Sequence, residues 1–209
     1  MNLHPHAVLS LECIKSNIQD NCIMNESSKN SGKNGSKEQI AEAMKILIRE
    51  KKFSKITVGD ICEKSSLSRQ SFYRKFNDKY DVFAYLFKTY VDNAYNNYGL
   101  MAMPEIGQMG IEFFREYRNA IKDMGCDFGY PNPFMVYWFN FCKDHYYSVI
   151  GKSKITPELE AAMRFYFHAT YFTFYEYVSG NIKADPAEMI RIVLNFMPEI
   201  LRNTLYKKE

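Results

Sequence analysis

Apolar residues recur at helical spacing along most of the chain, and no segment alternates apolar and polar residues with the period of a β-strand. Such stripes predict helices over about residues 36–51, 78–98, 105–124, 134–150, 157–179 and 186–206. Pro198 lies inside the last of these and is expected to kink or split it. With two short helices between residues 57 and 76, the pattern predicts an all-α chain of about nine helices.

Two short helices joined by a tight turn are predicted in the segment TVGDICEKSSLSRQSFYRKFNDK, residues 57–79. Thr57 can cap the first helix, because its hydroxyl can accept a hydrogen bond from a backbone N–H that would otherwise lack a partner. Ser65 and Ser66 interrupt the apolar pattern, since short hydroxyl side chains favour caps and turns. Ser68 is the expected cap of the second helix. The segment is therefore either a helix-turn-helix or a plain helical hairpin with a solvated basic face.

Polar residues gather at the start of the second helix. Arg, Gln and Ser side chains can match the hydrogen-bonding groups on base edges in the major groove. A helix-turn-helix directs the N-terminal residues of its second helix at those edges. The candidate DNA-contacting residues of this helix are Ser68, Arg69, Gln70, Ser71 and Arg74.

The positive charge of the chain is concentrated in the same region. Residues 37–80 carry 11 Lys or Arg and 6 Asp or Glu, a net charge of +5, whereas residues 1–36 balance at 0 and residues 81–209 stand at −2. Neutralisation of DNA phosphates requires a local excess of this kind. The charge distribution therefore favours duplex DNA as a partner.

The segment from residue 37 to about residue 86 resembles the DNA-binding domain of TetR-family transcriptional regulators. The family usually has Gly in the turn, where this chain has Ser66, and Ser adopts a positive φ less readily than Gly. The resemblance is carried by the order and spacing of Ile40-Ala41, Leu47-Ile48, Phe53, Ile56-Thr57-Val58, Asp60-Ile61, Leu67-Ser68, Phe72-Tyr73-Arg74-Lys75-Phe76 and Lys79.

This resemblance implies an organisation and a set of contacts. It implies a DNA-binding domain over residues 37–82 and a helical regulatory and dimerisation domain over residues 83–209. It assigns Arg69 and Gln70 to bases, and it assigns Thr57, Tyr73 and Lys79 to phosphates. The segment FNDKYD at residues 76–81 and the aromatic-rich helix at 166–180 are further similar to the subgroup of dihydroxyacetone-kinase operon regulators.

The resemblance implies a sequence-specific regulator, a homodimeric repressor on an inverted-repeat operator whose affinity responds to a small molecule or a partner. The alternative is a helical protein-interaction module or co-regulator that has lost specific DNA binding. Residues 1–36 are expected to form a disordered or dispensable tail, because the stretch NESSKNSGKNGS at 25–36 cannot bury enough apolar surface to become ordered. Either this tail is a flexible arm or Met24 is the true start.

The helix at 157–179 is apolar on nearly all sides, which predicts burial against a partner chain or around a pocket. The last helix adds a stripe at helical spacing. We therefore expect a homodimer interface that contains Tyr175, Ile190, Leu194, Met197 and Leu201. The aromatic residues could instead line a small-molecule pocket, for which the candidates are Trp138, Tyr166, Thr170 and Phe174.

The sequence contains little that indicates catalysis or metal binding. Five scattered cysteines without a C-x-x-C pair fit free thiols in a reducing cytoplasm. Cys142 and His145 are a weak start for a metal site or a nucleophile–base pair, with His168 the one further ligand in the core. Phosphate-loop, H-E-x-x-H and G-x-S-x-G motifs are missing. We expect neither an enzyme nor a cofactor or metal, and the apolar run near the N-terminus is too short to span a membrane.

Overall fold

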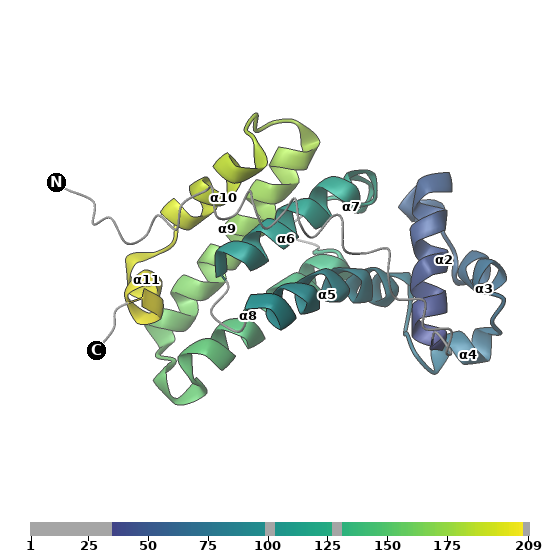
Figure 1. The fold of residues 1–209 in the computed structure, drawn as a ribbon, viewed down its shortest axis with the longest axis horizontal. Coiled ribbons are helices and arrows are strands. Elements are labelled where there is room, and N and C mark those ends of the chain that lie inside the picture. Colours follow the sequence, from purple (N-terminus) through teal and green to yellow (C-terminus); the bar gives the residue numbers. More distant parts are fainter. Residues whose placement is uncertain (1–34, 99–102, 127–130, 207–209) are drawn as a thin grey trace. The chain divides into compact units, whose positions relative to one another are not determined.

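The computed structural model describes residues 35–98, 103–126 and 131–206, and within these ranges it contains ten α-helices and no strand. The predicted all-α class is therefore confirmed, and Figure 1 shows the arrangement of the helices. Every described residue belongs to one compact unit, residues 35–209. The tail predicted at residues 1–36 lies almost wholly outside the described residues.

The predicted helix-turn-helix is present, and its caps are those that the sequence predicts. It comprises α2 (Ser36–Glu50), the 3₁₀ turn η2 (Phe53–Lys55), α3 (Val58–Ser65) and α4 (Arg69–Tyr73), followed by α5 (Lys79–Tyr98). Thr57 forms a capping box with Asp60 at the start of α3. Ser68 accepts a hydrogen bond from Ser71 N at the start of α4, and Asp78 accepts from Tyr80 N and Asp81 N at the start of α5.

The turn between α3 and α4 is strained at the position where the sequence departs from the TetR pattern. Ser66 has φ 56° and ψ 32°, and it is the one non-glycine residue with positive φ in the described part of the chain. Its side chain is exposed to solvent. The left-handed conformation is costly for residues with a Cβ atom, so Ser66 adopts a conformation that glycine would adopt at lower cost.

Ser66→Gly is expected to raise the free energy of unfolding by about 0.5–1 kcal/mol, because it removes the Cβ atom from a left-handed position. Urea unfolding measures the change. Ser65→Gly is the matched control: the same substitution one residue earlier, inside α3, should lower stability by about the same amount. A loss of stability in both variants would contradict this explanation of the turn.

The remaining helices differ from the prediction at one break. They are α6 (Met103–Glu116), α7 (Arg118–Met124), α8 (Pro133–Ile150), α9 (Pro157–Ser179), α10 (Pro186–Asn195) and α11 (Glu199–Tyr206), with a 3₁₀ turn η3 (Lys152–Lys154) after α8. The single helix predicted over 105–124 is wrong, because Tyr117 at φ −100° and ψ 22° separates α6 from α7. The break has a tertiary cause: α6 packs against α5, whereas α7 turns to pack against η2.

Pro198 splits the last helix into α10 and α11, as predicted, because it has no N–H to donate to Leu194 O, and carbonyls at the end of α10 need other donors. Side chains from other positions supply the donors. Tyr166 donates its hydroxyl proton to Val193 O at 3.1 Å. Arg202 Nη2 donates to Leu194 O at 2.8 Å and to Asn195 O at 3.1 Å. The break is therefore stabilised by α9 and α11 together.

One buried apolar cluster runs from α2 through α5 to α6, α7, α8 and part of α9. It passes directly through the domain boundary predicted at residues 82 and 83, where Val82, Phe83 and Ala84 are all buried. Phe83 packs edge-on against Phe53 of η2 and against Phe134 of α8. A second cluster joins α8, α9 and α11. The division at 82 and 83 stays a prediction.

Candidate functional site

The exposed residues of α4 and the turn after it form a polar and basic surface. Arg69, Gln70, Tyr73, Arg74 and Lys75 are all exposed, and Tyr73 is 55% exposed. The same helix is anchored by Phe72, which is fully buried and packs near Phe76. We call these five exposed residues the α4 surface. It contains four of the predicted DNA-contacting residues.

The α4 surface carries three cations without a carboxylate partner, whereas two cations of the neighbouring helices α2 and α3 are paired. Lys51 lies 2.7 Å from Asp60 Oδ2 and Lys64 lies 2.8 Å from Glu50 Oε1. Within the described residues, Arg69, Arg74 and Lys75 have no carboxylate at ion-pairing distance. Three unpaired cations therefore lie together on the α4 surface.

Arg69 lies across the junction of α3 and α4. A Cβ atom placed on Gly59 would be 3.1 Å from Arg69 Nη2, so the guanidinium group rests beside the first turn of α3. The absence of a side chain at Gly59 leaves room for this close approach. The long Arg69 side chain can reach outward by rotation about its own bonds, without any change in the backbone.

Thr57 and Ser68 use their hydroxyls inside the fold. The Thr57 hydroxyl accepts from Asp60 N at 3.1 Å and donates to Asp60 Oδ2 at 2.8 Å. The Ser68 hydroxyl accepts from Ser71 N at 3.1 Å and lies at the same distance from Ser71 Oγ. The DNA contacts predicted for Thr57, Ser68 and Ser71 stay predictions, and each would have to coexist with these hydrogen bonds or replace them.

Asp60 accepts hydrogen bonds from Lys51 and from the backbone and side chain of Thr57, and these lower its pKa to about 2. Since the folded chain holds the carboxylate charged more firmly than the unfolded chain does, Asp60 stabilises the fold above about pH 4. This contribution is lost as the pH falls toward 2.

Asp60→Asn is expected to lower the free energy of unfolding at pH 7, and its difference from the unsubstituted chain should shrink as the pH falls from about 4 to about 2. Urea unfolding at a series of pH values measures the difference. Asp144→Asn, an exposed carboxylate on α8, is the matched control. A difference for Asp60→Asn that does not change with pH would exclude the proposed linkage.

Lys79 has a structural role that the sequence did not reveal. Its ammonium donates to three carbonyl oxygens around η2, those of Phe53 at 2.8 Å, Ser54 at 3.1 Å and Ile56 at 3.0 Å. It also lies 4.9 Å from the centre of the Phe53 ring. An ammonium group has three protons, and these carbonyls take all of them. The phosphate contact predicted for Lys79 stays a prediction, and it would require the ammonium to leave at least one carbonyl.

The same turn is held from the other side by α7. Ser54 N donates to the carboxylate of Asp123, which lies 69 residues further along the chain. This hydrogen bond lowers the pKa of Asp123. Residues 53–56 are thus fixed between Lys79 of α5 and Asp123 of α7, which ties the helix-turn-helix to the larger helical body.

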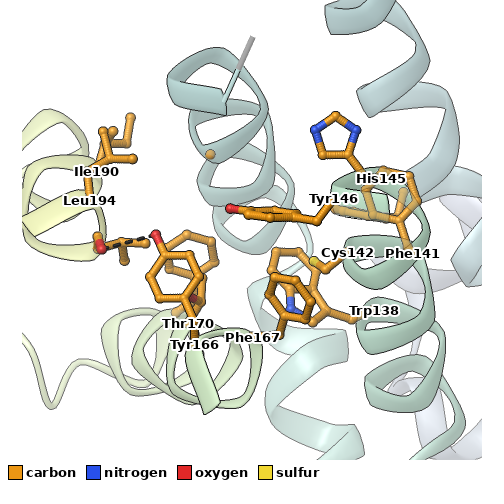
Figure 2. A pocket seen from close by; sticks show the side chains of 14 residues that line it. Trp138, Phe141, Cys142, His145, Tyr146, Tyr166, Phe167, Thr170, Ile190 and Leu194 are labelled. Atoms are coloured by element: carbon orange, nitrogen blue, oxygen red, sulfur yellow. Dashed lines mark hydrogen bonds between the residues drawn. The ribbon is translucent and has the colours of Figure 1, made fainter. Parts of the chain in front are cut away.

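A cavity of about 70 Å³ lies among α5, α6, α8, α9 and α10. All four predicted pocket residues, Trp138, Tyr166, Thr170 and Phe174, line it. Figure 2 shows Trp138 and Tyr146 of α8 facing Tyr166 of α9 and Leu194 of α10 across this space. The structure therefore brings the predicted pocket residues together, and their binding of a ligand stays a prediction.

The five residues of the predicted dimer interface differ in how far their own chain covers them. Leu201 has no exposed surface and Met197 is 5% exposed, and both belong to the cluster formed with α8 and α9. Ile190 and Leu194 are half-buried and line the cavity. Tyr175 is half-buried and packs against the main core. The predicted interface stays a prediction, and Met197 and Leu201 have little surface left for a second copy to contact.

The apolar surface that does face outward lies elsewhere on the predicted helices. Phe165 of α9 and Phe196 at the end of α10 are each 80% exposed, the highest values for large apolar side chains among the described residues. On α9, Phe165 shares one exposed face with Ala161, Ala169 and Phe172. The sequence predicted that α9 is buried against a partner chain or around a pocket, but not which face stays exposed in the single chain, because a helix that is apolar on nearly all sides has no clear polar face to mark the outside.

The side chains that could have carried other chemistry are held in neutral forms. Burial raises the pKa of the Cys142 thiol and lowers the pKa of His145 to about 4. A neutral thiol beside a neutral imidazole lacks the thiolate character of a nucleophile. In the described part of the chain no cluster of His, Cys, Asp and Glu has the arrangement of a metal site. None of the helices described here has the length and apolarity needed to cross a membrane.

The sequence matches no protein-family model and no curated protein. Two solved structures are similar in fold. The dihydroxyacetone kinase operon activator DhaS gives a TM-score of 0.53 with 15% identity over 80% of this chain and 96% of that chain. A TetR-family transcriptional regulator from Syntrophomonas wolfei gives a TM-score of 0.52 with 19% identity over 83% of this chain and 96% of that chain. The chain has the fold of TetR-family regulators.

Proposed function

We propose that this protein is a sequence-specific DNA-binding transcriptional regulator that acts as a homodimer. The observation that supports this most directly is the α4 surface. Its cations lack carboxylate partners, whereas the cations and hydroxyls that support the helix-turn-helix are bonded inside the fold. An unpaired basic surface on the second helix of such a motif suits the major groove.

Within this proposal the residues of the α4 surface have separate roles. Arg69 and Gln70, in the first turn of α4, contact base edges, because Arg and Gln can each form paired hydrogen bonds with a base. Tyr73, Arg74 and Lys75 follow in the chain and contact phosphates, which fix the helix in the groove without selecting a sequence. Ser71 is half-buried and supports Arg74, whose Nη2 lies 3.4 Å from its hydroxyl.

The proposed homodimer uses the exposed face of α9. The face alternates small and large side chains, Ala161, Phe165, Ala169 and Phe172. Across a two-fold axis in an antiparallel contact, Phe165 of one copy would lie over Ala169 of the other, and the reverse contact follows by symmetry. Two copies would then present two α4 surfaces to half-sites about one helical turn apart, or a multiple of it, in an inverted repeat.

A molecule bound in the cavity would contact both α6 and α10, which pack against each other. Through this contact, ligand binding would supply regulation. We further propose repression: a dimer on an operator that overlaps a promoter excludes RNA polymerase. A reporter gene under such an operator should then rise in expression when the protein is deleted. The alternative, an interaction module without specific DNA binding, predicts no change in the reporter.

Selection of bound genomic fragments followed by gel-shift titration tests DNA binding. Arg69→Ala and Gln70→Ala are each expected to weaken the free energy of DNA binding by about 1–3 kcal/mol and to relax the sequence preference at one base position. Lys75→Ala should weaken binding to all DNA sequences alike. It should also reduce the slope of log affinity against log salt concentration by about one unit. Arg191→Ala, on α10 and paired with Glu188, is the control and should change neither. If no fragment is preferred at any salt concentration, the interaction-module alternative replaces this proposal.

A further inference from the structure

The cavity among α8, α9 and α10 is walled by neutral groups. Its lining contains no Asp, Glu, Lys or Arg, and it is dominated by aromatic rings that include Phe87, Phe141, Tyr146 and Phe167. His145 is neutral near pH 7, because burial lowers its pKa to about 4. An ion placed here would lose its hydration without meeting an opposite charge, which is strongly unfavourable. The chemistry of the walls therefore excludes charged occupants.

One polar atom in these walls has no hydrogen-bond partner among the described residues. Trp138 is 5% exposed, and its Nε1–H, a donor only, is buried and unpaired. The Thr170 hydroxyl, on the neighbouring helix, is also buried, and it interacts with the Tyr166 hydroxyl. Buried polar groups are nearly always satisfied, and an unpaired one costs free energy. An oxygen atom inside the cavity would satisfy the Trp138 donor.

The volume limits the size of the occupant. An engineered cavity of about 150 Å³ lined by apolar residues binds benzene, and the present cavity, at about 70 Å³, is roughly half as large. Gly107 of α6 also lines it, and a Cβ atom placed there would meet nothing within 4 Å. There is room for one compact molecule, and a side chain added at Gly107 would enter open space.

We propose that this cavity binds a small uncharged molecule of about three or four non-hydrogen atoms, with an apolar body and one oxygen that accepts a hydrogen bond from Trp138 Nε1. The Thr170 hydroxyl is the second polar partner. The regulatory meaning of this site rests on the proposed function, whereas the binding itself can be measured without DNA. Since Tyr166 bridges α9 to Val193 O of α10 beside the cavity, an occupant would contact both sides of that link.

Three probes of nearly the same shape, each with four non-hydrogen atoms, test the proposal: isobutane, 2-propanol and the isopropylammonium cation. Titration calorimetry and thermal shift measure binding, and the emission of Trp138, the only tryptophan of the chain, reports occupancy. 2-Propanol is expected to bind about tenfold more tightly than isobutane, because only 2-propanol offers an oxygen to the indole N–H. Isopropylammonium should bind at least about tenfold more weakly than isobutane, because its charge would be buried without a partner.

Substitutions locate the interaction. Trp138→Phe keeps an aromatic ring and removes the N–H, so the preference for 2-propanol over isobutane should disappear. Thr170→Val should reduce it, whereas Thr173→Val, the same change on α9 at a residue that does not line the cavity, should leave it intact. Gly107→Leu should abolish binding of both neutral probes, and an unchanged melting temperature would show that the fold is retained.

Equal binding of isobutane and 2-propanol would overturn the proposal, as would preferential binding of the cation. Absence of binding by all three probes, at concentrations up to the solubility limit of isobutane, would overturn it as well. The test of the proposed function is separate. A protein that prefers 2-propanol but shows no preference among DNA fragments retains the cavity site and loses the regulator assignment, and the reverse result does the opposite.

Discussion

Lys79→Met is expected to lower the free energy of unfolding by about 2–3 kcal/mol, because the ammonium of Lys79 is the shared donor for three carbonyl oxygens around η2. Methionine retains the length and the apolar stem and removes only the charge and the donors. In a chain of this size the loss corresponds to a fall in melting temperature of roughly 5–10 °C. Urea and thermal unfolding measure it.

Lys88→Met is the matched control, because Lys88 lies on the same helix and pairs only with the exposed carboxylate of Asp92. An exposed ion pair contributes little, so this variant should change stability by less than about 0.5 kcal/mol. The comparison separates the loss of a lysine from the loss of the carbonyl partners.

DNA binding distinguishes the two roles of Lys79. If the ammonium stays on the carbonyls, the Lys79→Met protein at low temperature, where it is folded, should keep the salt slope of the unsubstituted chain. If Lys79 instead holds a phosphate, stability should be unchanged and the slope should fall by about one unit. The second result would restore the role implied by the TetR resemblance and exclude the structural role.

Local features of the fold could be predicted from the sequence, because their causes lie within a few residues. The caps Thr57 and Ser68 depend on hydrogen bonds that span three positions. The break at Pro198 follows from its missing N–H. These features are confirmed because tertiary packing does not oppose them.

Features set by distant contacts could not be predicted. The carbonyl partners of Lys79 lie 23 to 26 residues away in the sequence, and Ser54 meets Asp123 across 69 residues. Nothing near Tyr117 in the sequence marks the break between α6 and α7, which arises because α7 packs against η2. Each of these depends on which surfaces meet, and periodicity does not contain that information.

The cavity and the last helix show what periodicity can and cannot predict. The aromatic content of α8 and α9 predicted that Trp138, Tyr166, Thr170 and Phe174 could surround a pocket, and the structure places all of them on one cavity. The stripe of the last helix predicted an interface at Leu201, which is instead buried. Periodicity shows that a face is apolar, but the element that covers it follows only from the packed structure.

Phe165→Glu is expected to convert the proposed dimer into monomers, raising its dissociation constant at least about 100-fold. At a two-fold interface each substitution buries two carboxylates, one from each copy, in an apolar contact without a cationic partner. Within the single chain the cost should be small, because Phe165 is 80% exposed and exposed substitutions usually change stability by less than about 0.5 kcal/mol. Sedimentation equilibrium and thermal unfolding measure the two effects separately.

Phe165 is a sharper probe of the interface than Leu194, which the sequence also suggested. Leu194 is half-buried and lines the cavity, so a charge there would destabilise the single chain, and monomers could arise from partial unfolding. Val136→Glu is the matched control: Val136 is an apolar residue of α8 that is 43% exposed and lies outside the proposed face. It should leave a stable dimer.

Loss of the dimer should also remove operator binding, although the helix-turn-helix is unchanged. Two α4 surfaces on one dimer bind two half-sites at once, and the second contact is made at a high effective concentration. A Phe165→Glu monomer would keep only the weaker contact of one half-site. A folded Phe165→Glu protein that remains a dimer and binds the inverted repeat normally would show that the copies meet through another surface, and Phe196→Glu would then test the exposed ring at the end of α10 by the same measurements.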